Sequence, residues 1–403
     1  MTLVAKFALA LFITKFLGLE TMGLYGLILG ATALSPFIMG FGLYSIINRY
    51  IVDIPLSQAM PVIVTRLFMT TVLYLILIPV MLMLNSFMGS PVPFDVALLS
   101  CLIVFFEHIG MDTHGILTSR HKATLATILF FIRSGLWMLI YMVLAWFIEP
   151  LRTFEVLLYF WLGSLVTTMV ILAGYLMAQK RYKLIAFDFK WILTSIPKGR
   201  YMYLFEAGHI GGQFIDRFFI TFLLGLETAG IYVFFWSLCN AAYNLTYFSV
   251  VQPNNPHVIG AAKRDDQPAF RAAVFYQQKQ AAIWGGVCCL AVLIATPILI
   301  DLLDKPELSN YFWIIWVLLP TALLRLGADT LQNAIYAKSK DKIMGLICLA
   351  SLSFSVVFLF ILIPLFGLLG ATLAAFATNL SLIAMRIWNA SPLLRLHVTQ
   401  EPK

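Results

Sequence analysis

Apolar runs of about 20 residues recur along the whole chain, separated by short clusters of Gly, Pro and charged residues. One such run, folded as a helix, crosses a hydrocarbon core of ~30 Å. The pattern therefore predicts an all-α integral membrane protein with about 12 transmembrane helices. The expected spans are residues 3–17, 22–47, 62–86, 95–118, 122–148, 154–178, 201–224, 228–250, 274–303, 311–337, 342–364 and 367–389.

Composition supports this interpretation and narrows the function. The chain is 61% hydrophobic and only 11% charged, which is far from the make-up of a soluble domain. All five cysteines fall in apolar runs without metal-ligand spacing, so we expect packing residues, no metal and no cofactor. The net charge of +8 is spread over short loops, which argues against nucleic acid as a partner.

Basic residues alternate from loop to loop. The even-numbered loops hold sixteen Lys and Arg residues, whereas the odd-numbered loops hold only Arg152 and Lys305. Because cytoplasmic loops are enriched in these residues, both termini are expected in the cytoplasm, with the chain in the bacterial inner (plasma) membrane. No loop is long enough for an enzyme domain, so we expect no enzyme. The longest, around 179–200, predicts a short helix along the membrane surface.

The two halves of the chain repeat each other. FITKFLGLETMGLY at 12–25 matches FITFLLGLETAGIY at 219–232 in ten of fourteen positions, and HIGMDT at 108–113 is echoed by RLGADT at 325–330. We expect Gly18 and Gly225 to end one helix in a left-handed conformation, and Thr21 and Thr228 to cap the next. The predicted units are an N-terminal six-helix lobe (1–183), a cytoplasmic amphipathic linker (184–200) and a C-terminal six-helix lobe (201–403).

At these residues the chain resembles the multidrug/oligosaccharidyl-lipid/polysaccharide exporter superfamily, and within it the Wzx-type O-antigen flippases. The resemblance is carried by FLGLETMGLY at 16–25, GILTSRHK at 115–122 and IPLFGLLGAT at 363–372. It implies two lobes around a central cavity that opens alternately to each side. It also implies an undecaprenyl-diphosphate-linked oligosaccharide as cargo. We expect a monomer among membrane lipids, with a polysaccharide polymerase and chain-length machinery as partners.

Ionisable residues inside the predicted spans fall on helical stripes. Because such groups are costly in lipid, they are expected to face a cavity or one another. The stripe in the seventh span contains Glu206, His209, Gln213, Asp216 and Arg217; the other stripes contain Arg325, Asp329, Gln332, Asn333 and Tyr336 (tenth span), Asn240, Tyr243, Asn244 and Tyr247 (eighth) and Glu107, His108, Asp112 and His114 (fourth). Two interpretations are open: a shared aqueous cavity, or structural pairing between helices.

A diphosphate cargo needs cations and hydrogen-bond donors along its path. The predicted substrate-binding residues are Arg217, Arg325, Lys6, His209, Gln213, Tyr243, Asn244 and Tyr247. Carboxylates at bilayer depth suggest coupling to an ion gradient, and the predicted ion-coupling residues are Glu206, Asp216, Asp329 and Asp112. Alternatively, Asp216 and Asp329 simply neutralise Arg217 and Arg325.

Four charged positions are assigned from their depth. At 1.5 Å per residue, Glu107 and Arg133 lie about 19 Å and 16 Å from the cytoplasmic boundary, close enough in height to form a pair. Lys15 and Arg66 lie nearer to span ends and are expected to snorkel to the interface.

These observations favour a flippase that carries the lipid-linked oligosaccharide for O-antigen, capsule or exopolysaccharide assembly by alternating access. The alternative is a cation-coupled multidrug or small-molecule exporter of the same superfamily. A membrane-embedded polysaccharide polymerase is disfavoured because it would need a sizeable extramembrane loop.

Overall fold

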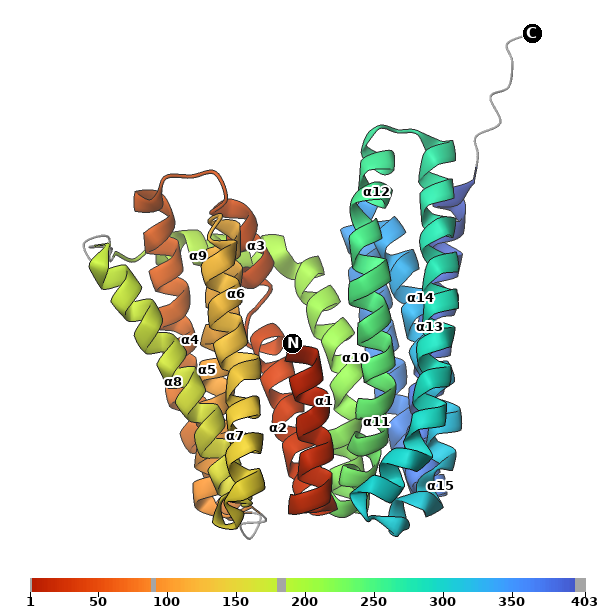
Figure 1. The fold of residues 1–403 in the computed structure, drawn as a ribbon. Coiled ribbons are helices and arrows are strands. Elements are labelled where there is room, and N and C mark those ends of the chain that lie inside the picture. Colours follow the sequence, from red (N-terminus) through yellow and green to blue (C-terminus); the bar gives the residue numbers. More distant parts are fainter. Residues whose placement is uncertain (1, 88–91, 180–185, 396–403) are drawn as a thin grey trace. The chain divides into compact units, whose positions relative to one another are not determined.

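A computed structural model describes residues 2–87, 92–179 and 186–395, and every regular element in these ranges is a helix (Figure 1). The chain divides into two compact units, Met1–Tyr203 and Leu204–Lys403. The predicted all-α, two-lobed fold is thereby confirmed.

The first unit contains the helices of the first six predicted spans and a helix of the predicted linker, α9. They are α1 (Thr2–Phe12) with a π-helical turn (Ile13–Leu17), α2 (Leu19–Ile38), α3 (Leu43–Tyr50), α4 (Leu56–Phe87), α5 (Phe94–Ser119), α6 (Ala123–Phe131), α7 (Trp137–Phe147), α8 (Phe154–Ala178) and the short α9 (Phe189–Ser195). The second predicted span, 22–47, is broken, because Gly42 takes a φ of 68° between α2 and α3. A π-helical turn (Ile132–Leu136) joins α6 to α7 in one apolar span.

The second unit contains the helices of the other six predicted spans and α12, which lies between the eighth and ninth spans. They are α10 (Arg200–Leu224), α11 (Leu226–Thr246) with a π-helical turn (Tyr247–Val251), α12 (Gln252–Lys263), α13 (Gln267–Leu303), α14 (Trp313–Ala337) and α15 (Asp341–Ala390). Helix α15 covers the last two predicted spans. Its backbone changes direction between them at Gly367 (φ 58°, ψ −132°). In the described part of the chain, eight helical segments are long and apolar enough to cross a membrane by themselves.

The duplicated turn has the same backbone in both units. Gly18 has φ 95° and ψ 171°, and Gly225 has φ 91° and ψ 170°, a region that is essentially restricted to glycine. The predicted threonine caps are wrong. The Thr21 and Thr228 hydroxyls instead donate to the carbonyls of Leu17 (3.0 Å) and Leu224 (3.1 Å), in the last turn before the glycine.

The predicted surface helix of the linker is α9, although residues 184 and 185 lie outside the described residues. Asp188 caps it by accepting a hydrogen bond from the Trp191 amide at 2.9 Å. Ile192 is fully buried in a cluster with residues of α3 and α4, whereas Phe189 and Leu193 are exposed. One apolar face therefore packs on the first unit and the other is left open.

Close approach of α10 and α15 depends on a glycine. A Cβ added at Gly208 would lie 2.6 Å from the carbonyl carbon and 2.7 Å from the carbonyl oxygen of Cys348. We expect Gly208→Ala to destabilise the protein by about 1–3 kcal/mol, because the helices must separate. Thermal unfolding in detergent measures the effect.

Gly212, one turn further along α10, is the matched control. A Cβ at Gly212 meets no atom within 4 Å, so Gly212→Ala should unfold with the wild type. Equal midpoints for the two variants would contradict the close approach.

Candidate functional site

The second unit contains a cavity of about 70 Å³ between α10, α11, α14 and α15. The wall combines aromatic, polar and ionisable side chains: His209, Gln213 and Asp216 from α10; Tyr232, Trp236, Asn240 and Tyr243 from α11; Thr321 and Arg325 from α14; Ser351, Thr378 and Asn379 from α15.

Arg325 is the cation of this wall. Its guanidinium donates to the side-chain oxygens of Gln213 (2.6 Å) and Asn240 (3.4 Å). It also stacks on the ring of Tyr243, 3.8 Å from the centroid. Gln213 in turn contacts His209 at 3.0 Å. Among the described residues, no carboxylate lies within ion-pair distance of Arg325, and its buried Nε has no hydrogen-bond partner.

Asp329 is not the counter-ion of Arg325. Its carboxylate forms an ion pair with Arg386 of α15 at 2.7 Å and accepts a hydrogen bond from the Tyr243 hydroxyl at 2.5 Å. Arg386 is 1% exposed and also donates to Gln332. The predicted neutralisation of Arg325 by Asp329 is therefore wrong, because Asp329 forms its ion pair with Arg386 instead.

Asp216 is the carboxylate of the cavity wall. It accepts hydrogen bonds from the Tyr232 hydroxyl (2.5 Å) and from the Arg217 backbone amide (2.8 Å). No basic side chain among the described residues lies within ion-pair distance of it. Its charge also interacts with that of the neighbouring Arg217. A buried carboxylate in a cavity wall is a candidate to take up a proton or a cation.

The predicted substrate-binding residues divide into two groups. Four of them, His209, Gln213, Tyr243 and Arg325, come together in the wall of this cavity. The other four lie elsewhere: Arg217 is fully buried between the rings of Phe214 and Trp236, Tyr247 stacks on Tyr243, Asn244 is outside the described lining, and Lys6 lies on α1 in the first unit.

Of the predicted ion-coupling residues, Asp216 and Asp329 are described above. Glu206 is buried on α10, one turn before His209. Asp112 belongs to the first unit, where it joins a buried network. Sequence reasoning missed Arg386, although an arginine inside the twelfth apolar run is the same kind of signal as Arg325.

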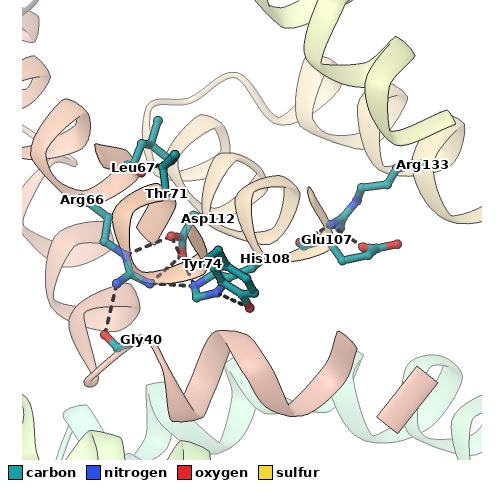
Figure 2. Close-up of polar contacts among 9 residues, drawn as sticks. All are labelled: Gly40, Arg66, Leu67, Thr71, Tyr74, Glu107, His108, Asp112 and Arg133. Carbon is teal, nitrogen blue, oxygen red and sulfur yellow. Dashed lines mark hydrogen bonds and ion pairs between the residues drawn. The ribbon is translucent and has the colours of Figure 1, made fainter. Parts of the chain in front are cut away.

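The first unit contains two buried ion pairs on α5, drawn in Figure 2. Arg66 of α4 binds the Asp112 carboxylate at 2.9 Å and contacts His108 at 3.0 Å, while Tyr74 contacts the other ring nitrogen of His108 at 3.2 Å. Arg66 is 3% exposed, so the prediction that it snorkels to the interface is wrong. Its guanidinium also approaches the Gly40 carbonyl at 3.4 Å.

The pair predicted from depth is confirmed. Arg133 and Glu107 are 2.8 Å apart, and the Trp161 indole donates to the second oxygen of Glu107 at 2.9 Å. Lys6 interacts electrostatically with both members of the pair. Lys6 therefore belongs to a buried charge cluster of the first unit.

Several solved transporters share this fold. The chain matches an inward-facing multidrug resistance MATE family transporter of the MOP superfamily with a TM-score of 0.75, at 16% identity, over 98% of this chain and 95% of that one. An outward-facing one matches with a TM-score of 0.62, at 17% identity, over 98% and 93%. A MATE protein in complex with MaL6 matches with a TM-score of 0.61, at 17% identity, over 98% and 94%.

No protein-family model matches the chain, and no curated protein does. At these identities the likeness shows the fold: the chain has the fold of MATE transporters of the MOP superfamily. The fold that the predicted resemblance implies is thereby confirmed, while the superfamily and its Wzx-type branch stay predictions.

Proposed function

We propose that the chain is a secondary transporter that exports a small amphipathic organic molecule by alternating access, driven by a proton or sodium gradient. The observation that carries this proposal is the fold, which matches multidrug transporters over 98% of the chain, in both inward- and outward-facing forms. The sequence favoured the flippase, whereas the fold and the cavity favour the small-molecule exporter.

The cavity of the second unit supports a small solute. Tyr232, Trp236 and Tyr243 offer rings for apolar or aromatic parts, and Arg325 offers a charged donor. Such a wall, aromatic with a few fixed polar groups, is typical of small-molecule sites.

Coupling is assigned to Asp216. Its carboxylate lines the same cavity, so protonation or cation binding there changes the charge that the solute meets. Asp329 and Asp112 already have arginine partners and are assigned a structural role.

Dye efflux from cells tests the solute site. Cells that express the chain should accumulate less of at least one small fluorescent dye, in a panel of one cationic, one neutral and one anionic compound. Arg325→Gln should lower efflux of that dye by about tenfold or more, because a hydrogen bond to a charged group contributes about 1.5–3 kcal/mol. Trp236→Ala should also lower it.

Arg271→Gln is the matched control, since Arg271 is an exposed arginine of α13 outside the cavity, and it should export normally. If neither Arg325→Gln nor Trp236→Ala reduces efflux at normal expression, the cavity is not the solute site.

Flipping of an undecaprenyl-diphosphate-linked oligosaccharide is a second candidate. One observation favours it: the Arg325 guanidinium lines the cavity without a carboxylate partner among the described residues, as a diphosphate would require. Deletion of the gene separates the two functions, because loss of surface glycan with unchanged dye efflux would favour the flippase.

A further inference from the structure

The first unit contains a second, larger cavity that plays no part in the proposed transport site. It has a volume of about 370 Å³ and lies against α5, which packs with both α4 and α8. Its walls are mostly aliphatic, with Met60, Ile63 and Leu67 on α4 and Leu172 and Leu176 on α8. Such walls favour an apolar chain over a water-soluble solute.

Two cations lie at the end of this cavity, Arg120 and Lys122, in the turn between α5 and α6. One guanidinium nitrogen of Arg120, Nη1, donates to the carbonyls of Ile51 and Ile54, each at 2.7 Å, which fixes the side chain in place. Lys122 is exposed. Among the described residues, no carboxylate lies within ion-pair distance of either cation, so both charges remain to be balanced from outside.

The cavity is at one end of three membrane-spanning helices. Its lining comes from the first turns of α4 and from the last turns of α5 and α8. These helix ends are where the distribution of basic loops predicts the cytoplasmic boundary of the bilayer. An aliphatic groove with cations at its rim, at the height of the headgroups, matches a molecule with an apolar tail and an anionic head.

We propose that this cavity binds an anionic membrane phospholipid, with an acyl chain along the aliphatic walls and the phosphate against Lys122 and Arg120. The proposal is independent of the transported solute, because the cavity and the solute site lie in different units.

Native mass spectrometry of the purified, delipidated chain tests the proposal, with phosphatidylglycerol and phosphatidylcholine as probes. The wild type should bind the first phosphatidylglycerol more tightly than the first phosphatidylcholine. Lys122→Ala should weaken phosphatidylglycerol binding about fivefold, because a cation near the membrane surface contributes ~1 kcal/mol. Ala173→Trp should weaken binding of both lipids, because Ala173 lines the groove and the larger ring fills it.

Lys342→Ala is the matched control, an exposed lysine at the start of α15 outside the cavity, and it should bind phosphatidylglycerol like the wild type. Glycerol 3-phosphate distinguishes a lipid from a free phosphate: in excess, it should leave lipid binding unchanged. Equal binding of the two lipids by the wild type, displacement by glycerol 3-phosphate, or unchanged binding in both Lys122→Ala and Ala173→Trp would overturn the proposal.

Discussion

Replacing Asp329 with leucine is expected to destabilise the protein by about 3–5 kcal/mol, because the variant leaves a buried arginine without its counter-ion. Arg386 is 1% exposed, and its only ion pair among the described residues is the one with Asp329. Its remaining contacts, with Gln332 and Cys348, are neutral. Neutral partners do not compensate a full charge at low dielectric.

The double variant separates a charge effect from a packing effect. Asp329→Leu with Arg386→Met removes both charges, so most of the lost stability should return. A deficit of about 1–3 kcal/mol should remain, because the Tyr243 hydroxyl loses its acceptor. Arg386→Met alone should be as damaging as Asp329→Leu, since a buried carboxylate then lacks its cation.

Thermal unfolding in detergent measures these differences. For a lobe of about 200 residues, 3–5 kcal/mol corresponds to a midpoint lowered by roughly 6–20 °C. Single variants that unfold at the wild-type temperature, or a double variant worse than both, would contradict a buried, mutually compensated pair.

Much of the fold could be predicted from the sequence, because the bilayer imposes helices of known length. The residues 12–25 and 219–232 predicted the internal repeat, and the structure gives both turns the same glycine conformation. The cap was mispredicted for a local reason. A helix that ends just before Gly18 or Gly225 offers free carbonyls four residues before each threonine, and the hydroxyl bonds to these instead.

The pairing of charges was harder to predict than their presence. Depth in the membrane was sufficient to predict the ion pair between Glu107 and Arg133, because the two residues lie at similar heights along their helices. For Arg66 and Arg386 the partner depends on which helices are neighbours and how each helix is rotated about its axis. The spacing of residues along one helix determines neither. The repeat of HIGMDT as RLGADT illustrates this. The repeated aspartate forms an ion pair with an arginine of α4 in one unit and with an arginine of α15 in the other.

The predicted polar stripe on α11 lines the cavity only in part, and one reason is that the helix changes its period. Tyr243 faces the cavity, but the α-helix ends at Thr246 and a π-helical turn begins at Tyr247. A wider turn rotates later side chains away from the face predicted at 3.6 residues per turn. Asn244, one residue beyond Tyr243, points about 100° away from it by the same geometry.

The second large effect that we expect is the loss of coupling between solute transport and an ion gradient. A gradient equivalent to 100 mV supplies about 2.3 kcal/mol per charge moved. That energy permits roughly 50-fold accumulation of a solute exchanged for one ion. Because Asp216 is the carboxylate that lines the solute cavity, Asp216→Asn should bind solute but lose the response to the gradient.

Solute flux in proteoliposomes under an imposed gradient tests the account most directly. With the exported dye on one side and a proton or sodium gradient imposed, the wild type should accumulate the dye against its own gradient. The flux should collapse when an ionophore dissipates the gradient, and it should be absent in Asp216→Asn. Dye movement at the same rate with and without any ion gradient, in the wild type and in Asp216→Asn alike, would contradict a cation-coupled exporter.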